Sequence, residues 1–104
     1  MIPPDMSVAM LVERAAEAAE TLKLLANEQR LRLLCRMMQS EASVGELVDL
    51  CALSQSSISQ HLARLREGGM VATRRDGTTI YYRLADEKVH ALISMLCDRF
   101  GPQS

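Results

Sequence analysis

Three cysteines, Cys35, Cys51 and Cys97, are the most reactive side chains in this sequence, and they lie far apart along the chain. A thiolate is a nucleophile and a soft-metal ligand, so these residues could react with oxidants or sulfur compounds or bind a soft metal. An odd number of cysteines without a secretion signal indicates free or switchable thiols in a cytoplasmic protein. Because a cysteine on an apolar helical stripe is often a small core residue, core packing is the alternative for Cys35 and Cys97.

A second chemical feature is a basic segment within an acidic chain. The net charge is −1 overall, whereas residues 54–83 carry five arginines against two acidic residues, a balance of +3. These arginines are Arg64, Arg66, Arg74, Arg75 and Arg83. Arginine is well suited to bind phosphate and guanine, so the distribution predicts a local anion-binding face for a nucleic acid. The alternative is a solvated charged surface without a ligand.

Several function classes are excluded by what the sequence lacks. No apolar run approaches the length of a transmembrane helix, because acidic residues interrupt the first long stretch. Met1–Asp5 has no basic region before an apolar run, so we expect no signal peptide. The sequence shows no nucleophile–base constellation, no glycine-rich phosphate loop and no cluster of metal ligands. We therefore expect no enzyme, no cofactor, no metal and no membrane partner.

Hydrophobic spacing predicts that mainly helices position these side chains. The chain has 104 residues, 48% of them hydrophobic, which fits one domain over residues 1–104. Helical periodicity predicts helices over about Met6–Ala26, Glu28–Met38, Val44–Cys51 and Gln55–Glu67, and a last one from Asp86 to the Gly101-Pro102 stop. Cap signals support these starts: Asn27, the capping box of Ser43 and Glu46, Ser54, and Asp86.

The same periodicity predicts which face of each helix is buried. The first helix carries an apolar stripe opposite an acidic face. The expected core residues of the next four helices are Leu31, Leu34, Cys35 and Met38; Val44, Leu47 and Leu50; Ile58, Leu62 and Leu65; and Val89, Leu92, Ile93, Leu96 and Phe100. The helix over Gln55–Glu67 buries only a narrow stripe. Its opposite face is rich in short hydrogen-bonding side chains, which suits close approach to base edges and phosphates.

The segment from Met70 to Leu84 changes to a strand pattern. Two β-rich runs, Met70–Arg75 and Thr78–Leu84, flank Asp76-Gly77, which is a strong hairpin signal. Ahead of it, two short helices joined by Ala52–Ser54 form a helix-turn-helix. A hairpin directly behind this motif, with arginines near its tip, is the wing of a winged helix. The predicted fold is therefore mainly α with a β-hairpin wing, in the order helix, helix, helix, helix, hairpin, helix.

The residues of these elements resemble the ArsR/SmtB family of small bacterial winged-helix repressors. The resemblance extends from about Leu22 to Phe100, and its most diagnostic segment is Leu53–Arg66. It implies a homodimer joined by the first and last helices, with paired recognition helices in successive major grooves of double-stranded operator DNA. The expected DNA contacts are Gln55, Ser56, Ser57, Ser59, Gln60, His61 and Arg64 on the recognition helix and Arg74 and Arg75 on the wing.

Members of this family sense chemical signals at different sites, and two of these sites do not fit the sequence. The arsenic-binding branch uses a Cys-x-Cys box, but the matching stretch, residues 46–51, contains a single cysteine, Cys51. The zinc-binding branch uses Asp and His ligands on the last helix. Asp86 matches one such position, but Lys88 and Arg99 cannot be ligands, and both histidines are then isolated.

A third branch, which senses oxidants or reactive sulfur species through two cysteines, fits best. Cys35 stands where that branch has its first cysteine, in the second predicted helix. The second is expected at the position of Gly101, whereas Cys97 lies one turn earlier, about 6 Å away along the same face. A disulfide needs Cα atoms within about 7 Å, but a chain of added sulfur atoms spans a longer gap. The resemblance implies Cys35 and Cys97 as sensor thiols, with Arg32 or Arg36 favouring the Cys35 thiolate.

Three alternatives stay open at the level of the sequence. A repressor of this fold without a thiol sensor could respond to another ligand or to its own concentration. Arsenic, antimony or another soft metal could bind through the cysteines. In a different class of protein, a helical interaction module with a methionine-rich face, the basic segment would be incidental. The favoured function is a cytoplasmic repressor that a small thiol-reactive inducer releases from its operator.

Overall fold

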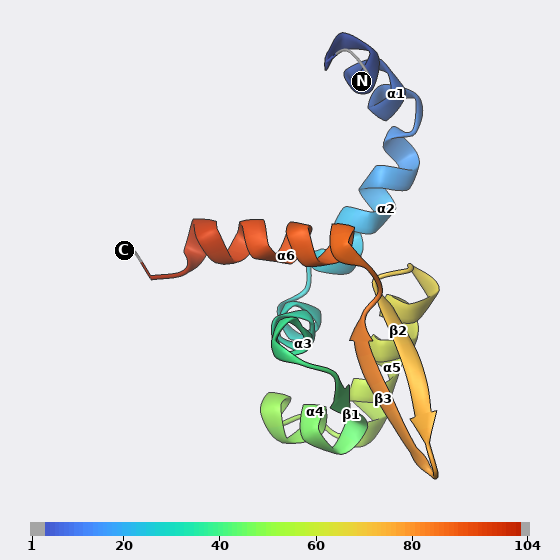
Figure 1. Ribbon diagram of the computed structural model, residues 1–104, viewed down its shortest axis with the longest axis vertical. Coiled ribbons are helices and arrows are strands. Elements are labelled where there is room, and N and C mark those ends of the chain that lie inside the picture. The colour runs from blue at the N-terminus through green and yellow to red at the C-terminus, as the bar shows by residue number, and fades with distance from the viewer. Residues whose placement is uncertain (1–3, 103–104) are drawn as a thin grey trace.

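The computed structural model describes residues 4–102, within which six helices and three strands are present (Figure 1). In chain order these are α1 (Pro4–Glu13), α2 (Ala15–Leu25), α3 (Glu28–Gln39), β1 (Ala42–Ser43), α4 (Val44–Cys51), α5 (Gln55–Glu67), β2 (Val71–Asp76), β3 (Thr79–Leu84) and α6 (Glu87–Phe100). The prediction on a signal peptide concerns Met1–Asp5, of which Met1–Pro3 lie outside the described residues. Among the described residues, no helix combines the length and apolar character needed to cross a bilayer.

The predicted starts of α3, α4, α5 and α6 are confirmed by their capping hydrogen bonds. Asn27, Ser54 and Asp86 each accept a hydrogen bond from the backbone amide three residues further on, at 3.0, 3.1 and 2.9 Å. Ser43 and Glu46 form the expected capping box. Each cap satisfies backbone amides that the helix itself leaves unpaired, which is worth about 1 kcal/mol.

The prediction of a single first helix is wrong, because the chain forms two helices broken at Arg14. Arg14 has φ −108° and ψ 23°, and its amide is shared between the carbonyl oxygens of Met10 and Leu11. No glycine or proline marks this break in the sequence. Every side chain from Met6 to Glu17 is exposed, so no contact with the core holds a single straight helix there.

The core lies between α3, α4, α5, α6 and the sheet, and α5 contributes the predicted stripe. Ile58, Leu62 and Leu65 are fully buried, as their spacing predicts. Leu47 of α4 is also fully buried, whereas Leu50 is 46% exposed, so that part of the prediction is wrong. The buried stripe of α5 turns its opposite face to solvent, and this face is the one that the sequence assigns to a ligand.

The predicted core face of α3 also needs correction. Its buried residues are Leu33, Leu34 and Met37, and Cys35 is exposed. The reason is that α3 packs against α2, α4, α5, α6 and β3 together, so its core face is wider than one stripe and is rotated from the expected one. On α6, Phe100 is 76% exposed because it lies beyond the last contact with the core.

The predicted hairpin is confirmed, with its turn one residue later than expected. β2 and β3 are antiparallel, and Asp76 pairs with Thr79. The two-residue turn is therefore Gly77-Thr78 and not Asp76-Gly77. Gly77 has φ +65°, a conformation that glycine adopts without strain. We call β2, this turn and β3 the wing.

A short strand that the sequence does not signal joins the wing to the helical body. Ala42 and Ser43 form β1, which pairs with Tyr82 and Tyr81 of β3, so that the sheet order is β1-β3-β2. Two residues are too few to show an alternating pattern. The predicted class, mainly α with a β-hairpin, is correct, but the predicted order lacks this strand and the break between α1 and α2.

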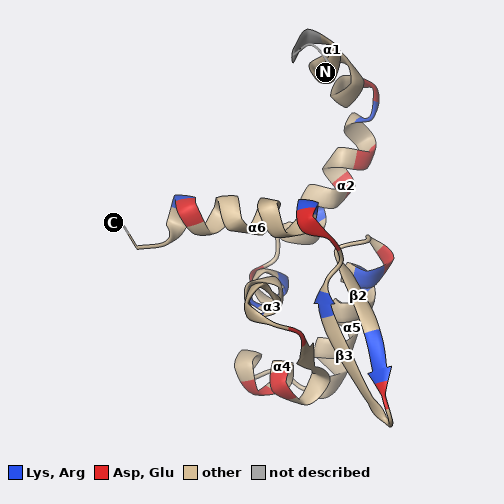
Figure 2. Cartoon of the chain, viewed as in Figure 1, with Lys and Arg blue, Asp and Glu red and all other residues tan. Residues whose placement is uncertain are grey.

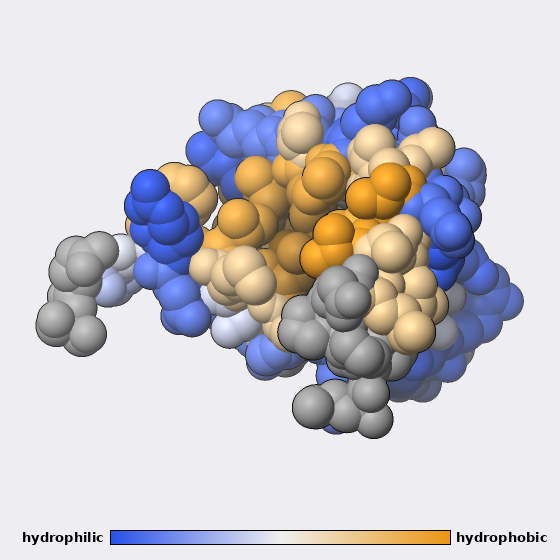
Figure 3. All heavy atoms as spheres, turned by 90° about the horizontal axis from the view of Figure 1, so that it is seen from above, coloured by the Kyte–Doolittle hydropathy of each residue, from blue (hydrophilic) through white to orange (hydrophobic). Residues whose placement is uncertain are grey.

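The two ends of the chain project from the body (Figure 1). The radius of gyration is 15.4 Å, compared with about 13 Å for a compact domain of this length. Large hydrophobic side chains on these projections are exposed, and we call them the apolar face: Met6, Val8, Met10, Leu11, Val12, Leu22, Met95 and Phe100. Figure 3 shows the molecule of Figure 1 from above, where hydrophobic side chains gather around a hollow. Leu22, Met95 and Leu96 are among the residues that line a hollow of about 360 Å³ there.

Candidate nucleic-acid interface and thiol site

The helix-turn-helix consists of α4, the turn Ala52–Ser54 and α5. Ala52 ends α4 in the left-handed region, with φ 53°, and its amide donates to the Val48 carbonyl at 3.2 Å. Ser54 then caps α5. On the outer face of α5 five of the predicted contact residues are exposed: Gln55, Ser56, Ser59, Gln60 and Arg64. These side chains are therefore free to meet a ligand.

Two further predicted contacts on α5 are partly engaged within the protein. Ser57 is half-buried, and its hydroxyl lies 3.1 Å from the Ser54 hydroxyl. His61 is also half-buried, with Nδ1 3.4 Å from the Arg30 guanidinium. Burial lowers the pKa of His61, and the charges of Arg30 and Arg64 lower it further, so the ring is neutral at neutral pH.

The two predicted wing arginines differ in their surroundings. Arg75 is exposed. Arg74 is paired with Glu41: its Nε lies 2.8 and 2.9 Å from the two carboxylate oxygens, and its Nη2 also contacts Oε1. The Arg74 guanidinium also lies over the Tyr81 ring, 4.6 Å from its centroid. Sequence reasoning missed Glu41, because it lies 33 residues before its partner. Figure 2 shows the basic residues along the wing.

Cys35 and Cys97 meet between α3 and α6. Both side chains are exposed, and both line one apolar cavity of about 520 Å³, which we call the thiol cavity. Its other walls include Leu31, Ile93, Leu96 and Phe100. The one-turn offset of Cys97 thus does not separate the two thiols. The structure brings together the two residues that the sequence pairs only by resemblance.

The expected activation of Cys35 by a neighbouring arginine is not found. Although solvent reaches the Cys35 side chain, the surrounding residues partly bury its sulfur. This partial burial raises the pKa of the Cys35 thiol, and the adjacent Cys97 thiol adds to the rise. Arg36 hydrogen-bonds Ser40 and pairs with Glu46 at 3.2 Å, and so it is engaged elsewhere. Arg32 lies 3.6 Å from Glu28. At neutral pH Cys35 is therefore mostly a neutral thiol.

Two further observations limit the chemistry of the thiol site. A Cβ atom at Gly101 would overlap the Cys97 carbonyl oxygen, so this backbone has no room for a cysteine side chain at position 101. Cys51 is buried in α4 and does not line the thiol cavity. Within residues 4–102, no group of three or more His, Cys, Asp or Glu side chains is placed to hold a metal ion.

A helix-turn-helix with an outward polar face, followed by a hairpin with arginines, defines the winged helix-turn-helix class of DNA-binding regulators. A model of the family described as "Bacterial regulatory protein, arsR family" matches residues 27–73. The transcriptional activator HlyU of Vibrio cholerae is 44% identical over 91 residues, which cover 88% of this chain and 84% of HlyU. The chain belongs to the ArsR family of bacterial transcriptional regulators; it is a regulator and not an enzyme.

Other comparisons agree with this assignment. The biofilm growth-associated repressor of Xylella fastidiosa (strain Temecula1) is 40% identical over 100 residues, 96% of this chain and 88% of that protein. The structure of reduced HlyU from Vibrio cholerae superposes with a TM-score of 0.82 at 42% identity, covering 89% of this chain and 98% of HlyU. The homodimeric winged helix-turn-helix domain of Mb0332 from Mycobacterium bovis superposes with a TM-score of 0.77 at 32% identity. The superposition covers 93% of this chain and 86% of the Mb0332 domain. Because HlyU is an activator and the Xylella protein a repressor, membership fixes transcriptional regulation but not its direction.

Proposed function

We propose that this protein is a homodimeric repressor that leaves its operator when Cys35 and Cys97 are modified by reactive sulfur species or oxidants. The observation that carries the proposal is the thiol cavity, in which two cysteines from α3 and α6 line the same apolar space. Two thiols that face each other can be joined by a disulfide or by a longer sulfur bridge. The inducer is then a small thiol-reactive molecule, and no resident cofactor is needed.

The proposed DNA interface is the outer face of α5 together with the wing. Exposed glutamine and serine side chains on α5 suit base edges and phosphates, and Arg64 suits a phosphate. Ser57 and His61, one helical turn apart on α5, are included in this interface, although both already have partners inside the protein. On the wing we assign backbone contacts to Arg75 and, in competition with Glu41, to Arg74.

The proposed dimer is supported by the apolar face. Its side chains on α1, α2 and α6 are exposed in the single chain, and an apolar surface of this kind marks an interaction site. The homodimeric state of the Mb0332 domain supports a second copy of this chain as the partner. A dimer would present two copies of α5, which must lie about 34–36 Å apart to enter successive major grooves.

The sulfur chemistry needs no group beyond the two thiols and the inducer. A persulfide R–S–SH transfers its outer sulfur to the Cys35 thiolate, which gives Cys35–S–SH and the thiolate R–S⁻. The Cys97 thiolate then attacks the inner sulfur of Cys35–S–SH, forming the disulfide and releasing HS⁻. The two cysteine thiols are oxidised, and the transferred sulfur is reduced. Joining α3 to α6 changes the angle between subunits and therefore the spacing of the two recognition helices.

The experiment compares Cys35→Ser and Cys97→Ser with the wild-type chain, and Cys51→Ser is the matched control. Each protein is treated with polysulfide, peroxide and arsenite in parallel, and its intact mass and operator binding are measured. We expect wild type and Cys51→Ser to be modified and released, and both sensor variants to stay bound to the operator. Release of both sensor variants by the inducer would show that these cysteines are not the switch. Release by arsenite alone would favour a soft-metal sensor.

A further inference from the structure

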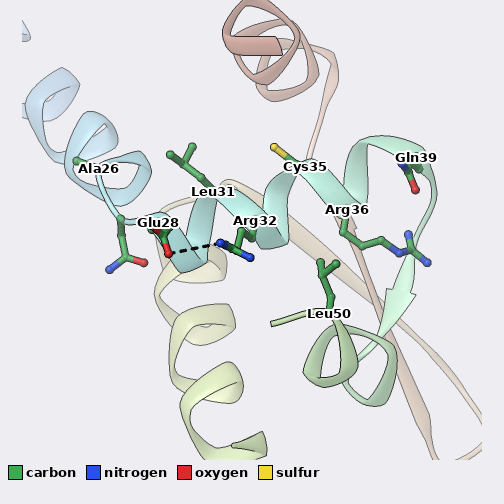
Figure 4. A pocket seen from close by; sticks show the side chains of 9 residues that line it. Ala26, Glu28, Leu31, Arg32, Cys35, Arg36, Gln39 and Leu50 are labelled. Carbon is green, nitrogen blue, oxygen red and sulfur yellow. Dashed lines mark ion pairs between the residues drawn. The ribbon is translucent and has the colours of Figure 1, made fainter. Parts of the chain in front are cut away.

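Cys35 is accessible from two different hollows. One is the thiol cavity on the α6 side. The other is a groove of about 710 Å³ along α3, whose lining includes Arg32, Arg36 and Leu50 as well as Cys35. We call it the arginine groove (Figure 4). Its volume falls within the usual range of small-molecule sites, about 300–1,000 Å³. Cys35 lines both hollows, but its sulfur points toward α6, so a reagent held in this groove must be long enough to extend around α3 to reach it.

The two hollows differ in chemical character. Among the residues that line the thiol cavity there is no charged side chain. In the arginine groove, Arg32 and Arg36 are one helical turn apart on the side of α3 that faces Leu50, while Cys35 points toward α6 from the rim (Figure 4). Leu31 and Leu50 supply an apolar surface, and Leu50 is 46% exposed. The groove thus combines cationic groups, an apolar wall and a nucleophile.

Arg32 is the cation best placed to meet a ligand. Its nearest acidic partner is Glu28, at 3.6 Å, and the two side chains are 56% and 75% exposed. Such a pair is weak and exchanges readily for a carboxylate of better geometry. The Arg36 side chain is only 21% exposed, and its guanidinium is held by Ser40 and Glu46. Arg36 therefore contributes positive charge to the groove, but its hydrogen-bond donors are already used.

We propose that the arginine groove docks carboxylate-bearing thiol donors, such as the persulfide of an anionic cysteine peptide, and presents their sulfur to Cys35. This inference rests on the proposed function, since it names the class of inducer. A neutral Cys35 thiol reacts slowly with a dilute reagent, so binding the donor beside it is an effective way to raise the rate. The carboxylate pairs with Arg32, and the sulfur chain reaches the rim of the groove, where Cys35 attacks the outer sulfur and R–S⁻ leaves.

The docking step can be tested apart from the persulfide chemistry. A full-length chain with Cys51→Ala and Cys97→Ala keeps Cys35 as its single thiol. The probes are the dianionic 5,5′-dithiobis(2-nitrobenzoate) and the neutral 4,4′-dithiodipyridine. Both form a mixed disulfide with Cys35 and release a product that is followed by its light absorption. The ratio of the two rates reports the preference for an anion. A change in the pKa or exposure of Cys35 acts on both rates and cancels in the ratio.

We expect Arg32→Gln to lower this ratio about two- to fivefold, the range that one exposed ion pair supports, and Arg32→Lys to retain most of it. Lys88→Gln, which removes the same charge from the exposed start of α6, is the matched control and should leave the ratio unchanged. An unchanged ratio in Arg32→Gln would overturn the proposal. An equal fall in Lys88→Gln would also overturn it, because the effect would then be one of net charge.

A second arm separates this inference from the proposed function. The wild-type chain and Arg32→Gln are treated with glutathione persulfide and with an uncharged persulfide, and modification of Cys35 and release from the operator are followed together. We expect Arg32→Gln to slow the reaction with glutathione persulfide only. Modification with the expected preference but no release would refute the proposed switch and leave the groove intact. Release at equal rates in both proteins with both donors would refute the proposed docking in the arginine groove and leave the proposed switch standing.

Discussion

At the scale of single residues, the surroundings of Cys35 oppose its reactivity. Burial is the main cause of its raised pKa, and the Cys97 thiol is the second. The thiolate is the reactive form, so the rate of alkylation should keep rising with pH beyond the range in which an ordinary cysteine has levelled off. A protein thiol with this profile discriminates against dilute, non-specific oxidants.

The two causes can be separated by substitution. In Cys97→Ala the contribution of the second thiol is lost and burial is retained, so the inflection of the pH profile should move down but stay above the ordinary cysteine value. The measurement is the rate of iodoacetamide labelling of the Cys35 peptide between about pH 6 and 11. An inflection that does not move would show that the two thiols do not interact in the folded protein.

Gln60 is the residue on α5 for which a role in base readout is most directly testable. Its side chain is exposed on the outer face, and glutamine can bind adenine through two hydrogen bonds. Gln60→Ala should relax sequence preference by about 1–3 kcal/mol per half-site while the fold is kept. Competition binding with operator variants measures this preference. If affinity and preference both match wild type, Gln60 takes no part in the readout.

Residue types and spacing predict the local features of the chain well. Caps such as Asn27 and Asp86 are read from the sequence because their hydrogen bonds reach only three residues away. The pKa of Cys35 and the pairing of Arg74 with Glu41 were not predictable in this way. Both depend on segments that lie far apart in the sequence and meet only in the folded protein.

At the scale of elements, the wing illustrates how one contact can be weakened by another. The Glu41 carboxylate raises the pKa of Arg74 and already offsets its charge, whereas Arg75 faces solvent. Each phosphate contact adds about −0.9 to the slope of log affinity against log salt. In a dimer, Arg75→Ala should flatten the slope by about two units, Arg74→Ala by less, and the double variant by up to about three to four.

Glu41→Gln is the matched test of this difference. It frees Arg74 from its carboxylate partner, so affinity for the operator at low salt should rise and the salt slope should steepen. Equal slopes for Arg74→Ala and Arg75→Ala, together with no effect of Glu41→Gln, would show that the ion pair does not compete with DNA. A slope identical to wild type in the double variant would show that the wing does not contact DNA at all.

Elements are predictable where their buried residues follow a single stripe. The three leucine and isoleucine residues of α5 follow a single stripe and are all buried as expected. α3 is different, since it contacts five other elements. Periodicity alone placed Cys35 inside and Met37 outside the expected core face. The break at Arg14 could not be predicted either, because it arises from missing core contacts and not from a helix-breaking residue.

At the scale of the whole molecule, the projecting helices that give the chain its extended shape carry the apolar face. Val12 is 68% exposed and Met95 67% exposed in the single chain, so changing them should not affect the core. If they are buried between two copies, Val12→Asp and Met95→Glu should each shift the protein toward a monomer and weaken operator binding. Leu50→Glu, a charge on an exposed leucine outside this face, should leave the dimer intact. Sedimentation velocity distinguishes these cases; a dimer unaffected by both substitutions would place the interface elsewhere.

Helix α3, which carries Cys35, is joined to the sheet of the wing by a short stretch of backbone. α3 ends at Gln39, one turn beyond Cys35, and Ala42 already pairs with Tyr82 of β3. Only Ser40 and Glu41 separate α3 from the sheet that carries the wing. We expect a shift of α3 along its axis to be passed to the wing unless these two residues absorb it. Under the proposed function, a bond formed at Cys35 would therefore reach the wing through this short stretch of backbone.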